Sequence, residues 1–179
     1  MIKLYQFDEL RPEEILNRDI RAEKNVEDVV DGILADVRAR GDAALKEYAL
    51  KFDGASIEEL QVTQAEIDEA FANMGPYFLE TLKEAAANIE AFHRQQVHKN
   101  FVVNDKPGIV LGQKYTPIEK AGVYVPGGTA AYPSTVLMDV IPAKVAGVSE
   151  IVMTTPAGKD GRVNPVILAA AATAAGLNG

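Results

Sequence analysis

Apolar and polar positions follow a helical period over the first part of the chain. Apolar residues recur three or four positions apart between residues 26 and 37, which predicts an amphipathic helix that Gly41 would end in a left-handed conformation. The residues of this stripe are Val26, Val29, Val30, Ile33, Leu34 and Val37. A second, short helix is predicted from Asp42 to Phe52, with Gly54 closing it.

Two further helices are predicted before residue 100. Thr63, followed three residues later by Glu66, forms a capping-box pattern, and this helix would break near Gly75. Pro76 suits the first turn of the next helix. The apolar stripe of that helix is Phe78, Leu82, Ala85, Ile89 and Phe92. The first hundred residues therefore indicate a mainly helical layer.

From Phe101 the pattern changes to short β-prone runs. These runs are FVV, then GIVLGQKY after a Lys-Pro-Gly turn, then AGVYV. Residues 134–147 suit a helix, in which Pro142 would make either a kink or a junction between two shorter pieces. Residues 150–154 form an apolar strand, and Asn164 would cap a last helix. The order strand, helix, strand, helix predicts an α/β fold with a parallel sheet.

Charged residues are unevenly distributed along the 179 residues, and their frequency falls near residue 120. Residues 1–119 hold 14 of 18 basic and 23 of 26 acidic residues, whereas residues 120–179 hold 4 and 3. A charge-poor segment rich in small and branched apolar residues suits strands and helices that are buried in an α/β layer. We therefore expect a helical region with short strands over residues 1–119 and a separate α/β region over residues 120–179.

Net charge and hydropathy limit the classes of binding partner and the cellular location that we expect. The formal net charge of −8, without a basic cluster, argues against nucleic acid and anionic membranes as partners. Apolar runs are too short to cross a bilayer, and the N-terminus lacks the pattern of a signal peptide. A cytoplasmic protein is expected. Cysteine is absent, which excludes disulfides and thiolate chemistry.

The most suggestive local feature is the run Tyr124-Val125-Pro126-Gly127-Gly128. A strand that runs into a glycine turn before a helix is where parallel sheets bind ligands, because glycine lets a phosphate approach backbone amides. The pattern is not GxGxxG, and such turns more often only reverse the chain. Tyr124 is equally ambiguous, since aromatic residues in strands usually fill cores. Both readings stay open on this pattern.

Metal and acid-base candidates are sparse. His93 and His98 are five residues apart, a spacing that does not place two ligands on one helix face, so we expect surface or loop residues and no metal site. The acidic pairs lie at adjacent positions, where their side chains diverge. Lys144 lies in an apolar helix and is expected to snorkel, with an anion contact as the alternative.

Three segments are distinctive when they are taken together: Ala121 to Pro156, the early helix pair Val37 to Gly54, and NIEAFHRQQ from Asn88. These segments resemble the histidinol dehydrogenase family. The resemblance implies a zinc- and NAD-dependent homodimer that oxidises L-histidinol to L-histidine through an aldehyde, with a glutamate-histidine pair for proton transfer. It also implies that residues 120–179 are the first β-α-β-α part of an incomplete Rossmann-like nucleotide-binding domain.

Site residues carry over from the resemblance only in part. Tyr124 matches the NAD-contacting tyrosine of the family's Tyr-x-Pro-Gly-Gly turn, and Pro126 beside it would line the same pocket. The zinc ligands and the glutamate-histidine pair of the family would lie beyond Gly179, so no catalytic or metal residue is assigned. This chain alone is therefore expected to bind no zinc and to be inactive. The alternative is a non-catalytic α/β module that binds a nucleotide or phosphate.

Overall fold

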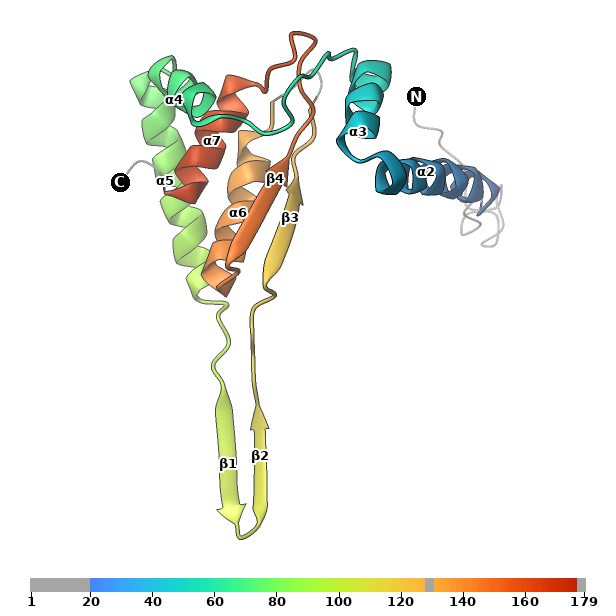
Figure 1. Cartoon of the computed structure of the whole chain (residues 1–179). Helices are drawn as coiled ribbons and strands as arrows, with labels where there is room; N and C mark the ends of the chain where they lie inside the picture. The colour runs from blue at the N-terminus through green and yellow to red at the C-terminus, as the bar shows by residue number, and fades with distance from the viewer. Residues whose placement is uncertain (1–19, 128–130, 177–179) are drawn as a thin grey trace, which may run out of the picture. The chain divides into compact units, whose positions relative to one another are not determined.

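A computed structural model of the chain describes residues 20–127 and 131–176 (Figure 1). Its helices are α2 (Ile20–Arg40), α3 (Asp42–Tyr48), the π-helical η1 (Ala49–Asp53), α4 (Gln64–Ala72), α5 (Pro76–Arg94), α6 (Pro133–Ala146) and α7 (Pro165–Ala175). Its strands are β1 (Phe101–Lys106), β2 (Ile109–Gln113), β3 (Lys120–Tyr124) and β4 (Glu150–Thr154). The chain forms two compact units, which divide between Leu45 and Lys46.

The first unit contains α2, and α3 begins in it. The predicted helix is confirmed, and Gly41 ends it with a φ of 57°, while its N–H donates to the Val37 carbonyl at 2.8 Å. The predicted second helix is confirmed as α3, but its last turn widens into the π-helical η1 before Gly54, whose φ is 67°. A left-handed backbone at both glycines is a conformation that other residues adopt at a cost.

Local signals also define the helices α4 and α5. The predicted capping box is confirmed, because the Glu66 N–H donates to Thr63 Oγ1 and the Glu66 carboxylate accepts from the Thr63 N–H at 2.8 Å. Gly75 precedes α5, and Pro76 is its first residue, as predicted. In the predicted stripe of α5, Leu82 is buried, whereas Phe92 near the C-terminal end is exposed.

The core of the second unit lies where α6 and α7 pack against each other and against α5 (Figure 1). On α6, Val136 and Leu137 are almost fully buried. Helix α7 is buried at Ile167, Leu168, Ala169, Ala170, Ala172 and Ala174. Pro142 lies inside one continuous helix, so α6 is not split into two shorter pieces. The predicted cap of α7 is confirmed, since Asn164 Oδ1 accepts from the Val166 N–H at 2.9 Å.

Strands β3 and β4 form a parallel pair with α6 as the connection between them, which confirms the predicted α/β order. Lys120 is paired with Glu150 at one end of the register and Tyr124 with Thr154 at the other. Successive side chains point to opposite faces of a sheet. Val123 accordingly lies buried in the helical core, whereas its neighbour Tyr124 is exposed.

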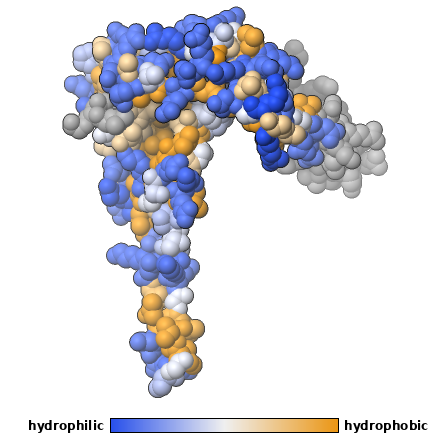
Figure 2. Space-filling view, viewed as in Figure 1, coloured by the Kyte–Doolittle hydropathy of each residue, from blue (hydrophilic) through white to orange (hydrophobic). Residues whose placement is uncertain are grey.

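Strands β1 and β2 form an antiparallel hairpin that turns at Gly108, where φ is 78°. Every residue of both strands is exposed, and Figure 2 shows apolar surface along the hairpin. The predicted boundary near residue 120 stays a prediction. Helices α4 and α5, which precede it, pack on α7 and α6, which follow it.

Candidate functional site

The candidate site lies where β3 and β4 end at the same edge of the sheet. The ladder continues one step beyond β3, because the Val125 N–H donates to the Thr154 carbonyl at 2.9 Å. After this step one chain segment turns toward α6 and the other toward α7. The carboxyl ends of parallel strands, where such loops diverge, are the usual place for a ligand in an α/β sheet.

A cavity of about 530 Å³ lies at this edge. It is lined by Asp53, Tyr124, Gly127, Pro156, Ala157, Gly158 and Lys159. Tyr124 is 61% exposed, so its ring does not fill the core of this chain. Tyr124 lines this cavity, and a cofactor contact of Tyr124 stays a prediction.

The glycine turn after β3 is described only up to Gly127, and Gly128 lies outside the described residues. A Cβ atom added to Gly127 would come within 3.2 Å of the Pro156 ring, so the two strand exits pack closely. Pro126 is half-buried and is not among the residues that line the cavity. A cofactor contact of Pro126 stays a prediction.

The loop from β4 to α7 is folded by its own hydrogen bonds. The Gly161 N–H donates to the Gly158 carbonyl at 2.8 Å, which closes a turn, and the Gly158 N–H donates to the Arg162 carbonyl at 2.8 Å. The guanidinium of Arg162 pairs with Glu69 on α4, and this hydrogen bond raises the pKa of Arg162. The loop is thus anchored to a helix of the core.

Lys159 and Asp53 were missed by the sequence analysis. Lys159 lies in the turn that Gly158 and Gly161 close, and Asp53 is the last residue of η1. Neither makes a hydrogen bond or ion pair with another described residue, so both charges are available to a ligand in the cavity. The position of Lys159 in the loop that follows a parallel strand was a usable signal, whereas Asp53 follows no strand.

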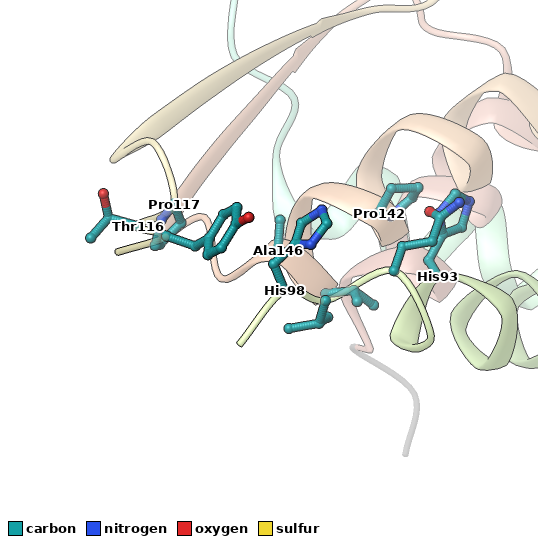
Figure 3. Close-up of a pocket in the computed structure, with 10 residues that line it drawn as sticks. His93, His98, Thr116, Pro117, Pro142 and Ala146 are labelled. Carbon is teal, nitrogen blue, oxygen red and sulfur yellow. The ribbon is translucent and has the colours of Figure 1, made fainter. Parts of the chain in front are cut away.

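A second cavity, of about 320 Å³, is lined by both His93 and His98 (Figure 3). His93 Nδ1 lies 2.6 Å from Gln96 Oε1, and the His98 ring stacks on Tyr115 at a centroid distance of 4.6 Å. His98 is exposed and His93 is half-buried at the end of α5. Among residues 20–127 and 131–176, no group of three or more His, Asp or Glu side chains could hold a metal ion. The two imidazoles thus lack further ligands within the described part.

Comparison with known proteins decides the family. The sequence model of histidinol dehydrogenase matches residues 16–178. This chain belongs to the histidinol dehydrogenase family. It is 49% identical over 176 residues to the histidinol dehydrogenase of Chlorobaculum tepidum, covering 97% of this chain and 41% of the relative. The histidinol dehydrogenase of Methanosarcina barkeri is 47% identical over 173 residues, covering 96% of this chain and 40% of the relative.

A solved structure of the family agrees with the fold. The crystal structure of histidinol dehydrogenase from Elizabethkingia anophelis superimposes with a TM-score of 0.79 at 35% identity, over 83% of this chain and 34% of that one. The resemblance seen in the sequence is thus confirmed. The chain spans about two-fifths of the length of the curated relatives it matches.

The two cofactors implied by the family differ in their fit to this chain. An exposed tyrosine, a glycine without a Cβ atom and a lysine around one cavity suit a dinucleotide, which has flat rings and a diphosphate. Zinc needs a cluster of nitrogen, sulfur or carboxylate donors, and the described residues contain none.

None of the described helices is long and apolar enough to cross a membrane.

Proposed function

We propose that this chain forms one wall of the NAD site in a cytoplasmic histidinol dehydrogenase. That enzyme oxidises L-histidinol to L-histidine in two NAD-dependent steps through the aldehyde, as a zinc-containing homodimer. The observation that carries the proposal is the exposed ring of Tyr124 over the cavity at the carboxyl ends of β3 and β4. Membership of the family supports the proposed reaction. The cavity supports the proposal that this chain contacts NAD.

The proposed roles of the residues follow from their positions. The Tyr124 ring packs against a ring of the cofactor, and its hydroxyl remains free to donate a hydrogen bond. Gly127 and Pro156 hold the two strand exits close together, which keeps one rim of the cavity narrow. Pro126, next to this rim, lines the same site once NAD is bound. Bound NAD would accept the hydride from the substrate.

The chain alone is proposed to turn over no histidinol. Alcohol oxidation also needs a base that takes the hydroxyl proton. Within the part of the chain that the structure describes, His93 contacts Gln96 and Phe92, His98 contacts Tyr115, and neither histidine is paired with a carboxylate. The described residues contain no group of donors that fits zinc, so this chain is assigned no part in holding it. Metal analysis after dialysis is expected to show no stoichiometric zinc, and a stoichiometric amount would contradict this view.

An assay of turnover tests the inactivity directly. Purified chain with L-histidinol, NAD and zinc should give no increase in NADH absorbance above a heat-denatured control. A steady increase above that control would contradict the proposal of inactivity, although it would leave the NAD site standing.

Chemical-shift mapping tests the site itself. NAD added to isotopically labelled chain should shift the amide resonances of Tyr124, Gly127, Ala157, Gly158 and Lys159, because these residues border the cavity. Residues 101–113 of the hairpin serve as the internal control. Shifts around His93 and His98 instead, or none at all, would contradict the proposed site.

A further inference from the structure

Resting on the proposed NAD site, we propose that Lys159 pairs with the diphosphate of the dinucleotide. Lys159 lines the same cavity as Tyr124, from the opposite strand exit. A lysine ammonium is a compact positive charge that binds phosphate oxygens through charge-assisted hydrogen bonds. The assignment makes Lys159 a residue that binds the cofactor, distinct from the aromatic contact of Tyr124.

The backbone at Lys159 is held in place by the turn that carries it. It lies inside the turn closed by the Gly161 N–H and the Gly158 carbonyl. Within that turn the Asp160 carboxylate accepts from the Arg162 N–H at 3.1 Å. A Cβ atom at Gly161 would lie 2.6 Å from the Ser56 carbonyl oxygen, so the turn packs tightly on the segment after η1. A fixed backbone lowers the conformational entropy that is lost when the lysine binds.

The charges around the cavity point to the same role. Lys159 is the basic residue and Asp53 the acidic residue among the described residues that line it, and no ion pair joins them. The whole chain has a formal net charge of −8, so a phosphate group finds little other attraction nearby. Asp53 would repel the diphosphate and accept hydrogen bonds from ribose hydroxyls. The two charges thus orient a ligand that contains both groups.

Lys159→Gln tests the inference by removing the charge at an exposed position. Lys106→Gln is the matched control, since Lys106 is also exposed, but on the hairpin rather than at the cavity. NAD affinity of Lys159→Gln should be about fivefold weaker at low salt, in line with a solvent-accessible charge pair. The difference should shrink at high salt, where such pairs are screened. Lys159→Arg should retain most of the affinity.

A second probe isolates the diphosphate. Adenosine has the ribose and an aromatic ring of the cofactor but no phosphate, so Lys159→Gln should leave its affinity unchanged. Equal losses for NAD and adenosine would mean that Lys159 supports the fold of the cavity instead, and would overturn the inference. A thermal melt that is unchanged in Lys159→Gln excludes misfolding as the cause of a loss.

The outcomes separate this inference from the proposed function. If the unaltered chain binds NAD and Tyr124→Ala weakens it, while Lys159→Gln equals Lys106→Gln, the NAD site stands and the role of Lys159 is wrong. If the unaltered chain shows no NAD binding, or Tyr124→Ala has no effect, the proposed site fails and the role of Lys159 fails with it.

Discussion

Neighbouring residues of β3 lie in opposite environments, and this contrast separates stability from binding. Val123 and Val125 are 7% and 0% exposed, whereas Tyr124 between them is 61% exposed. Val123 and Val125 lie on the covered face of the strand and belong to the core with α5, α6 and α7. Tyr124, at the open end of the strand, borders the cavity instead. Substitutions on the covered face should therefore reduce stability, and those at the open end should reduce ligand affinity.

The largest effect is expected in α6. Leu137 is 2% exposed, so Leu137→Ala removes buried methyl groups and leaves a cavity, which should lower the free energy of unfolding by about 2 to 5 kcal/mol. Met138 follows it on the same helix but is exposed, so Met138→Ala should change stability by less than about 0.5 kcal/mol. Urea denaturation measures both. Equal losses would contradict the arrangement of the core.

A smaller loss is expected at the loop that carries Lys159. Gly161 has a φ of 77°, a conformation that costs a residue with a Cβ atom roughly 1 to 2 kcal/mol, and a Cβ atom would also press on Ser56. Gly161→Ala should lower both stability and NAD affinity. Gly122→Ala is the control, because nothing lies within 4 Å of its added Cβ atom. If the two variants melt alike, the loop is not held as described.

The helix cap at Thr63 should contribute less to stability than the backbone conformation at Gly161. Thr63→Ala removes the side chain that accepts from the Glu66 N–H, and loss of such a cap typically costs about 1 kcal/mol. Thr116→Ala, at an exposed position outside any helix, serves as the control. NAD affinity should be unchanged in both variants, since α4 does not line the cavity. A marked loss of affinity in Thr63→Ala would link α4 to the site.

The smallest effect concerns acid pH. The Thr63 N–H and hydroxyl hydrogen bonds lower the pKa of the Glu66 carboxylate below its ordinary value. Because the pKa of Glu66 is lower in the folded than in the unfolded chain, the ionised carboxylate stabilises the fold at pH values above its ordinary pKa. This stabilisation is lost as the pH falls through the pKa of the folded state. Glu66→Gln should flatten this part of the pH dependence of stability. Curves of equal slope below pH 4.5 would contradict the cap.

Local signals predicted most of the helices and strands. Gly41, Gly54 and the capping box mark helix ends by chemistry that needs no distant partner, so their positions follow from sequence alone. The π-helical turn of η1 could not be predicted, because the same residues also fit an ordinary helical turn. Nor does a β-prone pattern tell whether a hairpin is covered, and β1 and β2 are exposed throughout.

The candidate site was only partly predictable. Tyr124 stands out because a strand runs directly into a glycine turn. Its exposure could not be read from the sequence, since either face of a strand can be the covered one. Lys159 lies in the loop after a parallel strand, which the sequence does show, whereas Asp53 joins the cavity from a segment far apart in the chain. The position of Asp53 depends on how the distant segments pack, which no local pattern encodes.

The most direct test of the account is the NAD affinity of Tyr124→Ala against that of Tyr77→Ala. Tyr77 is 83% exposed at the start of α5 and lies outside the cavity, so it matches Tyr124 in size and accessibility. Loss of a stacked aromatic contact of roughly 1 kcal/mol should weaken NAD binding about fivefold in Tyr124→Ala, with an unchanged melting temperature. Tyr77→Ala should bind as the unaltered chain does. An unchanged NAD affinity in Tyr124→Ala, together with a strongly lowered melting temperature, would show that Tyr124 is a structural residue and would contradict the proposed site.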